Sequence, residues 1–129
     1  MQSKSILLAL VLVNIVAITF TTPVCPIGIV QSKIGEWNDE NGCYSVWEVT
    51  LTNMATQNIK DVTVIGESNL NLRNSGDLWA LEQVYTNKFH LPSYVWEYGI
   101  EPGKTYKFGY INKGSNSAMF TFADITFKH

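Results

Sequence analysis

Aromatic residues are concentrated in one stretch of the sequence, from Ser75 to Tyr98. They are Trp79, Tyr85, Phe89, Tyr94, Trp96 and Tyr98. Pro92 interrupts the stretch, so it cannot form one regular element. Rings that stand in water can cover the apolar faces of sugars through area burial and weak C–H contacts, and fixing a Trp or Tyr loses little rotamer entropy. We therefore expect some of these rings to be exposed and to stack on a sugar polymer, held by a rigid β scaffold.

Length and charge limit the possible partners. A chain of 129 residues makes one domain with a single core. Its net charge is −2 and only 16% of its residues are charged, so it lacks the basic stripe that neutralises a phosphate backbone. Nucleic acid is therefore not an expected partner. The weak charge also argues against docking on acidic lipid and favours a neutral partner.

The first 22 residues have the pattern of a signal peptide. Lys4 provides the positive charge, residues 6–20 form an apolar run, and small threonines follow. An uncleaved membrane anchor is the alternative, but the run is short for a bilayer span and no basic flank follows it. We expect a signal peptide at 1–22 and a secreted, extracellular domain at 23–129, in a matrix or wall, without membrane association after cleavage.

Two cysteines, Cys25 and Cys43, lie just after the predicted cleavage site. In an oxidising compartment we expect them to form a disulfide, which would stabilise the fold by roughly 3 kcal/mol. The alternative is a catalytic thiol, which would need His90 or His129 as a base. Two cysteines and two scattered histidines lack the ligand spacing of a zinc site. No metal and no cofactor is expected.

The clearest strand signal is the alternation between Tyr44 and Asn53. The residues assigned to the core face are Ser45, Trp47, Val49 and Leu51. Trp47 is therefore expected to pack in the core more than to bind a ligand. Tyr44 lies on the opposite face and is a candidate for exposure.

Further strands are predicted at 26–34, 59–65, 106–110 and 118–127, the last in a central position because both of its faces are apolar. The segment 36–42 has the composition of a turn, which favours exposure of Trp37. No segment of the mature chain has the pattern of a long amphipathic helix. Short strands separated by turn signals predict an all-β fold, a single-domain antiparallel β-sandwich.

The order of several motifs resembles the family-49 carbohydrate-binding module, a cellulose-binding domain of some plant cellulases and of small secreted proteins of social amoebae. That family's blocks run Gln, Trp, a Tyr-rich strand ending in Val-Thr-Asn, Leu-Trp-Gly-Leu, Phe-Pro-x-Trp, Pro-Ala-Gly-Lys and Tyr-Ile-His. The matching positions here are Gln31, Trp37, Tyr44, Asn53, Leu78–Leu81, Phe89–Trp96, Pro102–Lys104 and Tyr110–Ile111. Three departures are Ala80 in place of glycine, a longer segment between Pro92 and Trp96, and Asn112 in place of histidine.

The resemblance implies that Trp37, Tyr44, Trp79 and Trp96 supply an aromatic binding surface for cellulose or a related β-glucan. Each ring should contribute on the order of 1–2 kcal/mol, so several rings on one face are needed for micromolar affinity. The alternative for Trp79 and Trp96 is that both are core residues closing one end of the sandwich.

Two other functions compete with a non-catalytic binding module. A small glycoside hydrolase would need two carboxylates converging across a cleft, and the sequence selects no such pair, so we do not expect an enzyme. A secreted protein-binding or signalling domain would use the same aromatic patch as an interface. Binding to a protein, with none to insoluble glucan, would distinguish that function.

Overall fold

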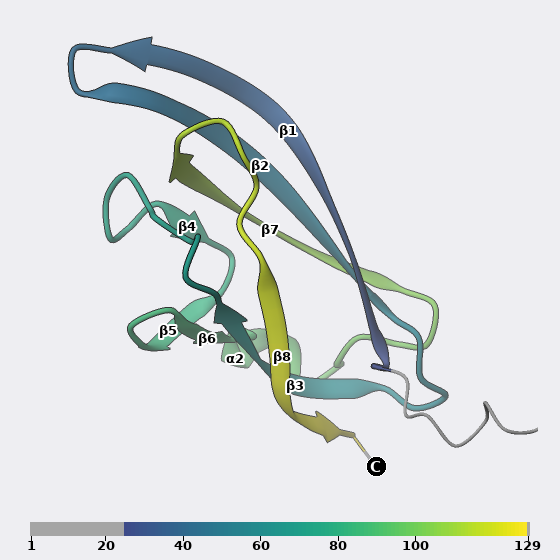
Figure 1. The fold of residues 1–129 in the computed structure, drawn as a ribbon. Coiled ribbons are helices and arrows are strands. Elements are labelled where there is room, and N and C mark those ends of the chain that lie inside the picture. The colour runs from purple at the N-terminus through teal and green to yellow at the C-terminus, as the bar shows by residue number, and fades with distance from the viewer. Residues whose placement is uncertain (1–24, 129) are drawn as a thin grey trace, which may run out of the picture.

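The computed structural model describes residues 25–128, so the predicted signal peptide at 1–22 lies outside the described residues. Eight strands in this part of the chain form two packed antiparallel sheets (Figure 1). The first sheet has the order β1 (Ile27–Asp39), β2 (Gly42–Asn53), β7 (Thr105–Lys113), β4 (Leu78–Trp79). The second has the order β5 (Glu82–Tyr85), β6 (Lys88–His90), β3 (Ile59–Gly66), β8 (Phe120–Phe127). The predicted all-β sandwich is confirmed.

The only helix in the described range is the short α2 (Ser93–Trp96), which begins directly after Pro92. Proline fixes the backbone where the chain enters the helix. The preceding strand β6 ends at His90, two residues before the proline. The aromatic stretch is thus divided among β4, β5, β6 and α2, which places its rings on different sides of the molecule. Within residues 25–128 there is no helix with the length and apolar content needed to cross a membrane.

The β1–β2 hairpin is longer than the sequence suggested. The predicted turn at 36–42 is wrong over most of its length, because β1 continues to Asp39 and only Glu40 and Asn41 form the turn. A register shift between Lys33 and Gly35 inserts one extra residue, a β-bulge that lets pairing resume beyond the glycine. Trp37 therefore lies on a paired strand, opposite Tyr44, and not in a loop.

The core lies between the sheets and confirms the predicted alternation of β2. Val49 and Leu51 are fully buried, and across the sandwich Phe120 makes edge-to-face contacts with Phe108 and Tyr110 at ring-centroid distances of 5.4 Å. Edge-to-face packing is favoured by the ring quadrupoles and adds to the stabilisation from area burial. The two sheets are therefore joined by an aromatic cluster.

A buried polar network also ties the two sheets together. The hydroxyl of Tyr110 donates to Oε1 of Gln31 and accepts the backbone N–H of Ala118 at 2.8 Å. Nε2 of Gln31 donates to the carbonyl oxygen of Ala118 at 2.7 Å. All the polar atoms of this triangle are paired, as burial requires. Gln31 is consequently a structural residue with a partly buried side-chain amide.

Two further expectations are corrected. β8 was predicted to lie centrally, but among residues 25–128 it is an edge strand that pairs only with β3. Its two apolar faces have another cause: the pairing register with β3 shifts around Asp124, which has a positive φ of 52°, so the side chains before and after it alternate in different phase.

The predicted disulfide between Cys25 and Cys43 is also absent, and both cysteines are free. Cys25 precedes the first residue of β1, whereas Cys43 pairs with Asn38 near the far end of that strand. The 13-residue strand therefore separates them by roughly 40 Å, while a disulfide needs α-carbons within about 7 Å. No local adjustment of the backbone can bring them together.

Candidate functional site

Three of the four predicted site residues lie on the outer face of the first sheet, the face directed away from the second sheet. Trp37 pairs with Tyr44 in the β1–β2 register, so the two side chains share a face. Trp79 on β4 pairs with Gly109 on β7, and Gly109 pairs with Glu48 on β2. Glu48 and Tyr44 are four residues apart on β2, so their side chains point to the same face, which Trp79 shares. We call Trp37, Tyr44 and Trp79 the aromatic face.

Trp79 is the most exposed tryptophan in the described part of the chain, with 44% of its surface accessible. Its ring lies against the backbone of Gly109, where a β-carbon would come within 2.3 Å of the ring. Glycine is thus required at this position for the indole to lie on the sheet. The ring is supported from below and its other side faces water, a geometry suited to stacking on a flat apolar ligand.

A small hollow of about 100 Å³ adjoins the indole of Trp79. Ile34, Glu48 and Lys107 line it together with Gly109, and the Lys107 ammonium lies 3.7 Å from the Glu48 carboxylate. An acceptor and a donor next to an exposed ring are the groups that a sugar hydroxyl needs for orientation. The hollow therefore places a hydrogen-bond acceptor and a donor beside the exposed ring.

Trp37 and Tyr44 form the other end of the aromatic face. Glu48 is in register with Gly109, the partner of Trp79. Tyr44 lies four residues away from Glu48 along β2, a distance of roughly 13 Å. The Trp37 and Tyr44 rings lie 5.6 Å apart, and the Arg73 guanidinium lies 5.5 Å from the centre of the Trp37 ring. Trp37 is therefore half-buried, with part of its ring held by a cation–π contact.

The Arg73 side chain is itself fixed by Asp77. Its Nε donates to a carboxylate oxygen at 2.8 Å, and this hydrogen bond holds the pKa of Asp77 below its ordinary value. The same bond raises the pKa of Arg73. Because Asp77 stays ionised into mildly acid solution, Arg73 keeps its position over Trp37 there.

Tyr44 is not exposed as predicted. It does lie on the outer face, but only 6% of its surface is accessible. Trp37 covers it from the neighbouring strand, which a reading of β2 alone could not reveal. Tyr44 can support Trp37 but offers little surface to a ligand.

Trp96 does not join the other three residues. It lies on α2 beside the second sheet, where its Nε1 donates to the Leu91 carbonyl at 3.0 Å and its ring lies 5.6 Å from that of His90. The four residues therefore do not form one surface. Trp47, expected to pack more than to bind, is partly buried against the core and donates from Nε1 to Ser45 Oγ at 2.8 Å.

Sequence reasoning did not select the polar members of this site: Glu48 could have been a partner for sugar hydroxyls but was not singled out, and Lys107 was not considered. Alternation along β2 and β7 places Glu48 and Lys107 on the outer face, but their proximity to Trp79 depends on the pairing of β7 between β2 and β4. Gly109 carried no signal by itself, because its role depends on a ring from another strand. No group of three or more His, Cys, Asp or Glu side chains within residues 25–128 is arranged to hold a metal ion.

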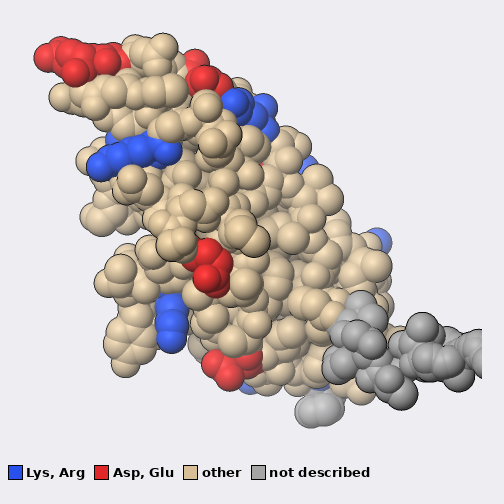
Figure 2. Space-filling model, in the orientation of Figure 1, with Lys and Arg blue, Asp and Glu red and all other residues tan. Residues whose placement is uncertain are grey.

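The charged side chains beside the site are paired, Lys107 with Glu48 and Arg73 with Asp77. Figure 2 shows isolated red and blue atoms on a mostly uncharged surface, with acidic atoms gathered at the end of the β1–β2 hairpin. Such a surface matches a neutral ligand that is recognised by contact area and hydroxyl hydrogen bonds.

Comparison with known proteins agrees with this geometry. The model of the carbohydrate binding domain family CBM49 matches residues 27–115. Spore germination protein 270-11 of Dictyostelium discoideum is 29% identical over 100 residues, which cover 77% of this chain and 18% of that protein. The chain thus spans about a fifth of that relative's length. It belongs to the CBM49 family, and this membership indicates that it binds carbohydrate.

Proposed function

We propose that this chain is a secreted, non-catalytic module that adheres to cellulose or a related β-glucan through its aromatic face. The observation that carries the proposal is the exposed indole of Trp79, which lies on Gly109 beside the hollow of Glu48 and Lys107. Trp79 and Trp37 contact the sugar rings, and Tyr44 supports Trp37. An extracellular matrix or wall would supply such a polymer.

The sandwich suits this task because its strands hold the rings in place. Trp79 is held on β4 by the pairing of this strand with β7. Trp37 is held by its strand partner Tyr44 and by Arg73. Little conformational entropy is then lost on binding. Two stacked rings and a few hydroxyl hydrogen bonds are sufficient for an affinity of about 1 mM.

The test is depletion of the protein from solution by microcrystalline cellulose. Trp79→Ala and Trp37→Ala should each weaken adsorption about tenfold, since each removes a stacking ring worth on the order of 1–2 kcal/mol. Tyr85→Ala is the matched control, because Tyr85 is an aromatic residue with 71% of its surface exposed on the other sheet.

Adsorption of the wild type and the control, with loss in the folded tryptophan variants, supports the proposal. Equal adsorption of all four proteins would show that another surface binds. If none adsorbs, the ligand is not cellulose, and the same face would then be tested as an interface for a protein partner.

A further inference from the structure

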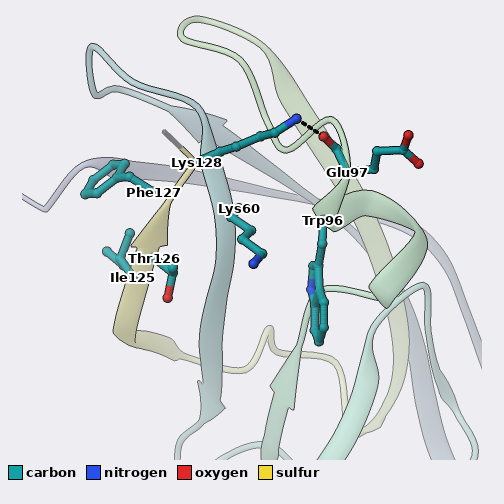
Figure 3. A pocket seen from close by; sticks show the side chains of 7 residues that line it. All are labelled: Lys60, Trp96, Glu97, Ile125, Thr126, Phe127 and Lys128. Atoms are coloured by element: carbon teal, nitrogen blue, oxygen red, sulfur yellow. Dashed lines mark hydrogen bonds between the residues drawn. The ribbon is translucent and has the colours of Figure 1, made fainter.

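A second hollow lies on the side of the second sheet and has no role in the proposed function. Its volume is about 880 Å³, and it shares no lining residue with the hollow beside Trp79. Figure 3 shows Trp96 on one side, residues Ile125, Thr126 and Phe127 of β8 on the other, and Lys60 of β3 between them. This volume lies in the range of small-molecule sites and is far too small to hold a folded protein.

The indole of Trp96 is fixed in the wall of this hollow. The hydrogen bond from its Nε1 to Leu91 and the contact with His90 hold the ring, while the ring remains partly accessible. Ile125 and Phe127 of β8 also line the hollow, and both pack partly against the core. A ring that is already ordered can cover the apolar face of a sugar without further loss of entropy.

Positive charge dominates the polar groups of the hollow. The Lys60 side chain is exposed and extends between Thr126 and Trp96, and it forms no ion pair with any residue between 25 and 128 (Figure 3). Lys128 lies at the rim, where its ammonium donates to the backbone carbonyl of Glu97. The carboxylate of Glu97 points away from Lys60 and neutralises nothing inside.

We propose that this hollow binds an anionic sugar unit, with the sugar face against Trp96 and its carboxylate or sulfate against Lys60. The chemistry differs from that of the aromatic face, where Lys107 is paired with Glu48. The Lys60 ammonium has no ion-pair partner among residues 25–128, so it is available to an anion, and Trp96 beside it offers an apolar contact to the sugar. The molecule is thus a two-site module that joins a neutral glucan to an acidic polysaccharide, and the second site does not depend on the first.

The test uses soluble probes and titration calorimetry on the mature chain. Oligogalacturonate and a sulfated dextran supply sugar with charge, cello-oligosaccharide supplies sugar without charge, and poly-glutamate supplies charge without sugar. At least one anionic sugar should bind. Trp96→Ala and Lys60→Gln should each weaken that binding about tenfold, which corresponds to the loss of one stacking or one charged contact. Added salt should weaken it as well.

Lys60 is exposed, so Lys60→Gln is expected to fold even if Trp96→Ala does not. Tyr85→Ala is the matched control, because Tyr85 is an exposed ring on β5 that lines neither hollow, and it should leave anionic sugar binding unchanged. The proposal is overturned if no anionic sugar binds the folded wild type, if the folded Lys60→Gln variant binds as well as the wild type, or if poly-glutamate binds as tightly as the charged sugars. These outcomes are independent of adsorption to cellulose, so either proposal can fail alone.

Discussion

Ala80 occupies a backbone conformation that favours glycine. Its φ of 71° lies in the left-handed region, where the β-carbon of alanine crowds the following carbonyl. The glycine of the family's Leu-Trp-Gly-Leu motif meets this requirement, and this chain departs from it directly after Trp79. The strain is retained because the Ala80 carbonyl accepts a hydrogen bond from the Tyr106 hydroxyl at 2.6 Å.

Replacing this alanine should therefore stabilise the protein. Ala80→Gly relieves the strain and adds some entropy to the unfolded chain, for an expected net gain of about 0.5–1 kcal/mol in the free energy of unfolding. Urea denaturation measures it. Ala123→Gly on β8 is the matched control and should lower stability by a similar amount, because a glycine inside a strand lacks packing. A loss of stability in Ala80→Gly would contradict the strain argument.

The Tyr110 hydroxyl should be important for stability. Tyr110→Phe leaves a partly buried acceptor on Gln31 and a buried N–H on Ala118 without their partner. Leaving these groups unpaired is expected to lower the free energy of unfolding by about 1–3 kcal/mol, measured by urea denaturation at pH 7. Tyr85→Phe removes an exposed hydroxyl and should change little. Equal stability of both variants would show that the network contributes nothing.

The same residue predicts a pH dependence. Burial raises the pKa of Tyr110 from 10.0 to about 12. Between these values the unfolded chain releases the phenolic proton while the folded protein retains it, so stability is complete below pH 10 and falls as the pH rises toward 12. The expected loss is up to about 3 kcal/mol at the upper end. Tyr110→Phe should lose less stability over this interval, and parallel curves for the two proteins would refute the assignment.

At the scale of elements, the contact between the Trp79 ring and Gly109 of β7 can be tested without mutating the tryptophan. Gly109→Ala places a β-carbon where the indole lies, so the ring must move and glucan adsorption should fall about tenfold. Gly35→Ala is the matched control on β1, because its added β-carbon makes only ordinary contact with Val46 at 3.7 Å. Adsorption isotherms on cellulose measure both. Unchanged adsorption by folded Gly109→Ala would show that the ring position is unimportant.

The β1 strand makes a prediction about the cysteines, because it keeps Cys25 and Cys43 at opposite ends. The folded, non-reduced protein should therefore react with two equivalents of a thiol reagent, Cys25 faster because it is more exposed. Unfolding curves with and without reductant should coincide for the monomer. The structure would be contradicted if the folded protein had no thiols that react with the reagent and became less stable on reduction.

Sequence patterns predicted the positions of the strands better than they predicted which strands lie next to one another. The alternation of β2 correctly assigned Val49 and Leu51 to the core, because side-chain period depends on local geometry. The burial of Tyr44 and the edge position of β8 depend on which strand lies alongside, and sequence periodicity carries no such information. The same limit applies to the site: Trp79 and Trp37 share a face through pairings between distant strands, whereas Trp96 is diverted by the break at Pro92.

At the scale of the whole molecule, the two hollows lie on different sheets and share no lining residue, so ligands at both should bind independently. A protein saturated with anionic sugar should adsorb to cellulose with unchanged affinity. Competition between the two ligands would mean that they share a surface. The measurement is a cellulose isotherm with and without oligogalacturonate.

The bulge in β1 has a consequence for copies of the protein that would lie side by side on the proposed polymer. β1 is a 13-residue edge strand, and long regular edges promote aggregation by pairing with a neighbouring copy. The extra residue at Ile34 breaks the ladder near its middle, and the charged pair Lys33 and Glu36, 2.6 Å apart, flanks it. If the proposed function holds, we expect copies brought together on a fibre to remain separate molecules that desorb one by one.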